Sequence, residues 1–157
     1  MKKLFLVLFV AGFSSCIKDY ISSTATYLHN ETEHTIEISP YKDGLVVSGD
    51  AKIIQPNERQ RVYDDSPYGR SLAPCWGRLI QPYDSVVVTF DASRRTVHLS
   101  FRDTTRLASS GYLRFVDSKN ITNEDSYKEI ITESNKNYLV GYYEYTFTEA
   151  DYEFAKD

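Results

Sequence analysis

The fold is decided by the stretch SVVVTFDASRRTVHLSF, residues 85–101, in which apolar and polar residues alternate twice around a short turn. In the first half the apolar positions are Val86, Val88 and Phe90, with Val87 as an apolar exception on the other side. In the second half the apolar positions expected to face inward are Val97, Leu99 and Phe101, and the polar positions expected to face outward are Thr96, His98 and Ser100. The turn between them, residues 92–94, is short enough for an antiparallel hairpin. Such strands predict an antiparallel sheet with one face on a core and one in water.

Similar but weaker patterns extend along the chain. Alternation and aromatic or β-branched content predict further strands at residues 24–28, 35–41, 51–54, 59–63, 111–116 and 138–147. The last of these places one set of large residues on a single face, namely Leu139, Tyr143, Tyr145 and Phe147. Residues 64–83 read as a long irregular connection, and residues 120–127 as a loop or a single helical turn. Thr148 and Asp151 have the spacing of a capping box, which predicts a short last helix.

Many short strands with regular turn signals are typical of a β-sandwich. We therefore predict an all-β fold, an antiparallel β-sandwich that is immunoglobulin-like or similar, with a short C-terminal helical turn. The expected organisation is a lipoprotein signal peptide at residues 1–15, a tether at residues 16–23 and a single domain at residues 24–157.

The start of the chain has the three parts of an export signal. Lys2 and Lys3 precede an apolar run over residues 4–13, and Ser14 and Ser15 then lead to Cys16. The run is shorter than the roughly 20 apolar residues that a membrane-spanning helix needs. Because a cysteine stands at the expected cleavage point, the segment resembles a bacterial lipoprotein signal, which implies that Cys16 is acylated.

Further stretches resemble one group of small exported lipoproteins of Bacteroidota. The segment Ile17-Lys18-Asp19 is similar to the surface-export tag of such proteins, and the other matching stretches are residues 27–32, 35–38, 84–91 and 145–152. The resemblance implies an all-β domain without an assigned activity, held by a lipid anchor in the bacterial outer membrane and facing the cell surface. An orientation toward the periplasm, as a structural or assembly factor, remains the alternative.

Charge argues against nucleic acid as a partner. Removal of the signal with Lys2 and Lys3 reduces 18 basic residues to 16 against 22 acidic ones, so the net charge moves from −4 to −6. Nucleic-acid binding needs a clustered basic face. The nearest approach to one is a set of four arginines that a solvated hairpin explains better: Arg94, Arg95, Arg102 and Arg106.

No motif in the sequence carries a recognisable chemistry. His29 and His34 have opposite parity and would point to opposite faces of a strand, so a zinc site would need a tight turn to bring them together. His98 falls on the polar positions of its strand and is expected at the surface. Glycine-rich phosphate loops and the Gly-x-Ser-x-Gly elbow do not occur in the sequence. We therefore expect no catalytic residue, metal or cofactor, with a small hydrolase that uses carboxylates as the alternative.

Aromatic residues offer the best candidates for ligand binding. The chain has 13 tyrosines and 8 phenylalanines, and four rings lie in or beside the long irregular segment: Tyr63, Tyr68, Trp76 and Tyr83. Exposed rings there would suit a glycan or a protein partner, whereas core packing is the competing interpretation. Cys75 lies in the same apolar neighbourhood and is expected to be a buried thiol rather than a reactive one. The sequence thus predicts a non-catalytic binding or accessory module of the envelope.

Overall fold

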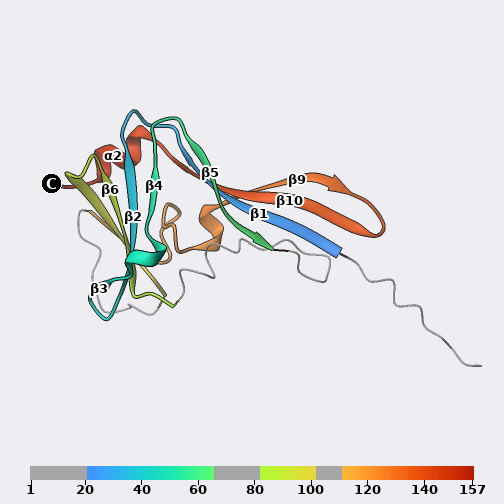
Figure 1. The fold of residues 1–157 in the computed structure, drawn as a ribbon, viewed down its shortest axis with the longest axis horizontal. Coiled ribbons are helices and arrows are strands. Elements are labelled where there is room, and N and C mark those ends of the chain that lie inside the picture. The colour runs from blue at the N-terminus through green and yellow to red at the C-terminus, as the bar shows by residue number, and fades with distance from the viewer. Residues whose placement is uncertain (1–20, 66–81, 102–110) are drawn as a thin grey trace, which may run out of the picture.

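A computed structural model describes residues 21–65, 82–101 and 111–157, which form two β-sheets and one short helix (Figure 1). Sheet A contains, in spatial order, β5 (Arg59–Asp65), β1 (Ile21–Asn30), β10 (Tyr138–Phe147) and β9 (Lys128–Ser134). Sheet B contains β3 (Leu45–Val46), β2 (Ile36–Lys42), β6 (Ser85–Phe90), β7 (Arg94–Leu99) and β8 (Tyr112–Leu113), and β4 (Lys52–Ile54) also pairs with β2. The remaining elements are the 3₁₀ turns η1 (Ser48–Asp50) and η2 (Glu124–Ser126) and the helix α2 (Glu149–Phe154).

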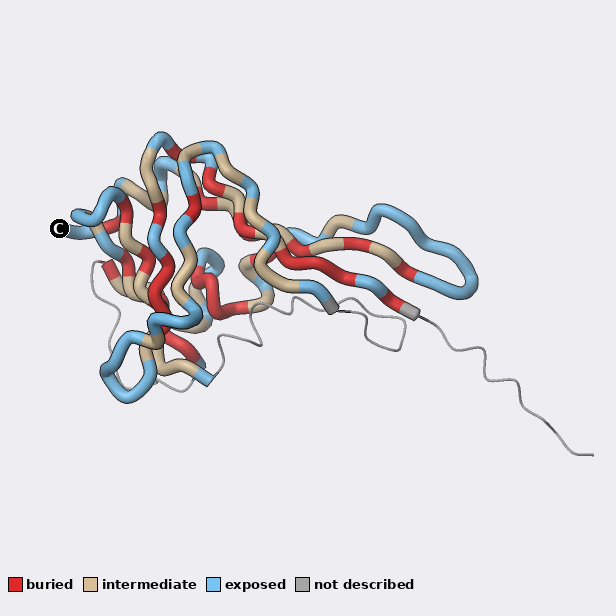
Figure 2. Tube along the Cα trace, viewed as in Figure 1, coloured by how far each residue is buried: buried red, intermediate tan, exposed pale blue. Residues whose placement is uncertain are grey.

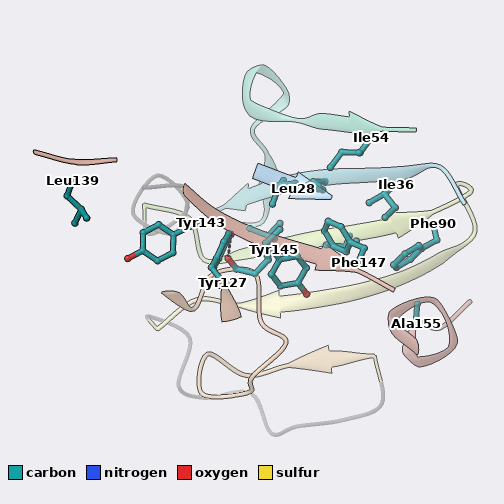
Figure 3. Close-up of a cluster of buried hydrophobic side chains, with 14 residues drawn as sticks. Leu28, Ile36, Ile54, Phe90, Tyr127, Leu139, Tyr143, Tyr145, Phe147 and Ala155 are labelled. Carbon is teal, nitrogen blue, oxygen red and sulfur yellow. Dashed lines mark hydrogen bonds between the residues drawn. The ribbon is translucent and has the colours of Figure 1, made fainter. Parts of the chain in front are cut away.

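The core lies between the two sheets, which confirms the sandwich-like all-β fold (Figure 2). Sheet A contributes Leu28 and the face of β10 that the alternation predicts, and sheet B contributes mainly apolar residues of β2 and β6. Figure 3 shows Phe147 of β10 close to Phe90 of β6, and their ring centroids are 6.4 Å apart in an edge-to-face arrangement. Tyr127 and Tyr145 are buried among these residues because each hydroxyl donates to a backbone carbonyl, Ile121 O and Lys119 O respectively.

Strand pairing is mixed rather than antiparallel throughout. β1 pairs in parallel with β10 over ten residues, from Ile21 opposite Tyr138 to Asn30 opposite Phe147, and β7 pairs in parallel with β8. The expected boundary of the tether at residue 23 is therefore wrong, since β1 begins at Ile21 and its first residues already bond to β10. In Figure 1, β1, β9 and β10 extend together beyond the rest of the molecule.

The hairpin of β6 and β7 forms as predicted and Leu99 is buried as expected, but the predicted facing of the other residues of β7 is wrong. The register pairs Phe90 with Arg94, Val88 with Thr96 and Val86 with His98. Directly opposite residues have their side chains on the same face of a sheet, so Thr96 and His98 join the buried face of β6. His98, Thr96 and Ser100 are buried, whereas Val97 is only half-buried and Phe101 is 45% exposed.

Other expectations meet mixed outcomes. The strand at residues 138–147 is confirmed, as is the capping box, in which Asp151 accepts from the backbone N–H and the hydroxyl of Thr148. The strand expected at residues 111–116 shortens to β8, and β9 was not predicted at all. The predicted turn at residues 55–58 joins strands of different sheets, because β4 pairs in sheet B and β5 in sheet A.

Residues 1–20, with Cys16, lie outside the described residues, and no helix in the described ranges has the length and apolar character to cross a membrane.

Two buried asparagines close the turns that lead from strands into loops. The side-chain amide of Asn30 donates to the carbonyls of His34, Ile54 and Gln55 while its oxygen accepts from both the N–H and the hydroxyl of Thr32. Asn120 repeats this arrangement with Thr122 and donates to the carbonyls of Leu99 and Leu113. Each asparagine thus links carbonyls of separate segments through buried or part-buried hydrogen bonds.

Candidate functional site

The outer face of sheet B contains a hollow. Across four neighbouring strands the register aligns Ser39 of β2, Val87 of β6, Val97 of β7 and Tyr112 of β8. These residues share the face opposite to the core, because their neighbours along β6 and β7 point inward. A hollow of about 410 Å³ lies over this row, with Val87 and Val97 in its lining. That volume is within the range of small-molecule sites, about 300–1,000 Å³.

Residues from both edges of the sheet complete the hollow. Besides the two valines, the described residues of its lining are Tyr41, Gly44, Asp84, Ser85, Arg95, Gly111, Tyr112, Lys156 and Asp157. Tyr41 belongs to β2 and Tyr112 to β8, with β6 and β7 between them, so the two phenols stand on opposite sides of the valine pair. The site thus combines an apolar floor with aromatic sides and a charged rim.

The C-terminal residues reach the hollow by pairing with β7. Lys156 and Arg95 exchange two backbone hydrogen bonds, Arg95 N–H to Lys156 O at 2.7 Å and Lys156 N–H to Arg95 O at 3.0 Å. Gly111 lies against this bridge with a positive φ of 83°, and a Cβ at that position would approach Lys156 Cγ to 3.2 Å. The positive φ therefore favours glycine, and the close approach of Lys156 leaves little room for a side chain at this position.

The charged side chains at the rim of the hollow differ in whether they have a bonding partner among the described residues. Asp84 accepts from the backbone N–H of Asp43 at 2.6 Å, and Asp157 forms an ion pair with Arg94 Nε at 3.4 Å. Arg95 and Lys156, in contrast, have no ion-pair partner within the described parts of the chain. The hollow therefore presents two available cations, and both of its carboxylates are already bonded.

The lining suits binding better than bond cleavage. Among the described residues, the lining includes neither histidine nor cysteine that could act as a base next to Ser85. Its carboxylates are bonded to the backbone N–H of Asp43 and to Arg94, as described above. Aliphatic and phenolic side chains with a few charged groups are what a recognition site uses to hold and orient a ligand.

Of the four predicted aromatic residues, two lie among the described residues and neither belongs to this hollow. Tyr63 is half-buried on β5 of sheet A. Tyr83 packs against the core cluster and its hydroxyl donates to Asp50, a hydrogen bond that, together with burial, raises the pKa of the phenol. Tyr68 and Trp76 lie outside the described residues, as does Cys75.

The histidines have structural partners. His29 Nδ1 lies 3.4 Å from Glu31 Oε1. His34 lies between two carboxylates, with Asp91 Oδ2 2.5 Å from Nδ1 and Glu149 Oε2 3.6 Å from Nε2, and its ring stacks on Tyr152 at 3.6 Å. The hydrogen bond with His34, followed by the backbone N–H of Thr35, holds the pKa of the Asp91 carboxyl below its usual value. His34 thus fastens the C-terminal helix to the hairpin turn.

Metal binding has no support in the described part of the chain. No group of three or more histidine, cysteine, aspartate or glutamate side chains converges there in a way that could hold an ion. In particular, His29 and His34 use different carboxylates, Glu31 for the first and Asp91 with Glu149 for the second.

The residues of the hollow were not identified from the sequence as a site. Arg95 was interpreted as part of a solvated hairpin face, and Val97 as a core residue. One signal could have located them. When the turn consists of the three residues 91–93, even-numbered residues of β6 lie opposite even-numbered residues of β7, and odd-numbered residues lie opposite odd-numbered ones. The apolar residues Val87 and Val97 then fall together on the outer face, next to Leu99 and Arg95.

The chain matches no protein-family model, no curated protein and no solved structure.

Proposed function

We propose that this protein is a lipid-anchored lipoprotein of the bacterial outer membrane, displayed toward the outside, which binds its ligand in the hollow on sheet B. The observation that carries the binding role is the row of Val87 and Val97 between Tyr41 and Tyr112, left uncovered by the described elements of the fold. The lipid anchor is inferred from the signal-like residues 1–15 followed by Cys16. A hydrolase is a weaker proposal because the carboxylates of the hollow are bonded to a backbone amide and an arginine.

The site is tested with ligand arrays of glycans and peptides, applied to the full chain solubilised in detergent. We expect Tyr112→Ala to lose most of the binding, because it removes one aromatic side of the hollow. Tyr138→Ala is the matched control, since Tyr138 is a partly exposed tyrosine at the start of β10 in the other sheet. Equal binding by both variants and the unchanged protein would exclude the hollow as the site.

The anchor and its orientation are tested on intact cells. We expect external protease to digest the unchanged protein without lysis, and Cys16→Ala to leave the membrane fraction. Protection until the cells are lysed would favour the periplasm-facing alternative. Retention of Cys16→Ala in the membrane would contradict lipidation at that residue.

A further inference from the structure

Arg95 and Lys156 form a pair of like charges that the backbone holds together. Their two reciprocal hydrogen bonds make them directly opposite residues of an antiparallel bridge, so both side chains leave the bridge on the same face. Cβ atoms of such pairs are roughly 5 Å apart, and like charges placed directly opposite destabilise a sheet. Both residues line the hollow and both are exposed.

The surroundings do not compensate this repulsion. Among the described residues, no carboxylate lies within ion-pair distance of either side chain, and the nearby Asp157 is paired with Arg94 instead. An arginine offers five N–H donors in a planar fork and a lysine offers three. Together they suit a group with several ionised oxygens, such as a carboxylate or a sulfate, whose binding would remove the repulsion.

The rest of the hollow fits a ring with an apolar face. Val87 and Val97 are half-buried and adjacent across β6 and β7, and Tyr41 and Tyr112 rise on either side. β2, β6 and β7 have neighbouring strands on both sides, so their backbone groups are used within the sheet and recognition over the valines depends on side chains. An extended peptide that pairs through its backbone would need a sheet edge rather than this face.

We propose that the hollow binds an acidic saccharide, with the sugar ring over Val87 and Val97 and its carboxylate or sulfate at Arg95 and Lys156. This inference rests on the proposed binding function and specifies its ligand class. Saccharides present flat C–H faces that pack on aliphatic and aromatic side chains, together with hydroxyls that tyrosine can bond. The net charge of the chain, −4 for the whole sequence, opposes anionic ligands at long range, so the local pair of cations is needed for selectivity.

The test is calorimetric titration of the full chain in detergent with four probes of equal length. These are a galacturonate tetramer, a sulfated galactose tetramer, a neutral galactose tetramer and a glutamate tetrapeptide. We expect the galacturonate or the sulfated probe to bind roughly tenfold or more tightly than the neutral one, and this preference to fall as salt is raised. The two acidic probes distinguish a carboxylate from a sulfate as the recognised group.

Two charge-neutralising variants and one control assign the effect. We expect Arg95→Gln and Lys156→Gln each to weaken the acidic saccharide by roughly tenfold while leaving the neutral one unchanged. The bridge itself uses backbone atoms, so both variants are expected to keep the circular dichroism spectrum of the unchanged protein. Arg61→Gln is the control, because it removes the same charge from an exposed arginine of sheet A.

The outcomes separate the two proposals. Equal affinity for acidic and neutral saccharides, lost in Tyr112→Ala but not in Arg95→Gln, would overturn the acidic ligand and keep the binding site. Binding of the glutamate peptide alone, dependent on Arg95, would overturn the saccharide. If none of the four probes binds, the acidic saccharide is overturned, whereas the proposed function fails only if Tyr112→Ala also leaves every array ligand unaffected.

Discussion

His98 shows why a polar residue belongs in this core. Its side chain is 3% exposed, and Nδ1 accepts the backbone N–H of Ile121 at 3.0 Å, which places the ring proton of the neutral form on Nε2. Burial lowers the pKa of the imidazole to about 3, from 6.5 in an unstructured chain. The ring is therefore a neutral acceptor that holds the loop after residue 120 against β7.

This burial makes stability depend on pH in a defined direction. Between pH 6.5 and about 3 the unfolded chain binds a proton at His98 and the folded chain does not, so the free energy of unfolding falls as pH falls through this range. From pH 7 to pH 5 the loss due to His98 is about 2 kcal/mol. His98→Asn keeps an acceptor without a titrating ring. We expect urea unfolding of this variant to lose about 2 kcal/mol less over that pH interval.

The comparison isolates His98 because His29 and His34 are present in both proteins. A variant that shows the same pH dependence as the unchanged protein would mean that His98 is not buried as a neutral ring. Lower stability of His98→Asn at pH 7 would not affect the conclusion, since only the difference between the two pH values is compared.

At the scale of elements, the β6–β7 hairpin shows what the sequence could and could not predict. Both strands and the turn follow from alternation, as does the buried face of β10. Alternation does not reveal which face of β7 is inside, because Val97, Leu99 and Phe101 alternate as regularly as core residues do. The length of the turn sets the register of the hairpin, and this register places Thr96 and His98 on the buried face of the sheet. Of the three residues expected to face inward, Leu99 is buried nonetheless, whereas Val97 is half-buried and Phe101 is exposed.

The edge strand β9 could not be predicted for a different reason. Its residues, Lys128–Ser134, are mostly exposed, and only Ile130 is half-buried. No core face imposes alternation on such a strand, and charged residues on an edge help to prevent pairing with other chains. β9 forms because β10 offers it backbone partners, which is a tertiary cause that leaves little trace in the local sequence.

Paired valine substitutions test the facing of the hairpin. Val88 is 1% exposed in the core, whereas Val97 is half-buried on the outer face. We expect Val88→Ala to lower the free energy of unfolding by about 2–3 kcal/mol, through lost apolar burial and the cavity left behind. Val97→Ala should cost less than about 1 kcal/mol in the same urea titration. The opposite order of the two losses would restore the facing expected from alternation.

For the whole molecule, the C-terminal segment is one of the connections that join the sheets beyond their core contact, besides the hydrogen bond from Asn30 of β1 to Ile54 of β4. β10 belongs to sheet A, and the chain continues through α2 to the bridge between Lys156 and β7 of sheet B. On the way, Tyr152 stacks on His34 and Glu149 Oε1 accepts the backbone N–H of Glu33 at 3.1 Å. The same segment thus fastens the fold and supplies Lys156 to the hollow, which couples the stability of the domain to its candidate site.

Removing residues 155–157 tests this coupling. The truncation removes Ala155, which is 2% exposed and packs in the core, together with the two backbone hydrogen bonds to Arg95. We expect a loss of roughly 2–3 kcal/mol in the free energy of unfolding, from about 1 kcal/mol per hydrogen bond and a similar amount for the buried methyl group. Lys156→Gln is the control, because it keeps the backbone bonds and should change stability by less than about 0.5 kcal/mol. Urea unfolding followed by circular dichroism measures both. A truncated protein as stable as the full chain would show that the core and the remaining connections, such as the bonds of Asn30, hold the two sheets together, and that the C-terminal residues only line the hollow.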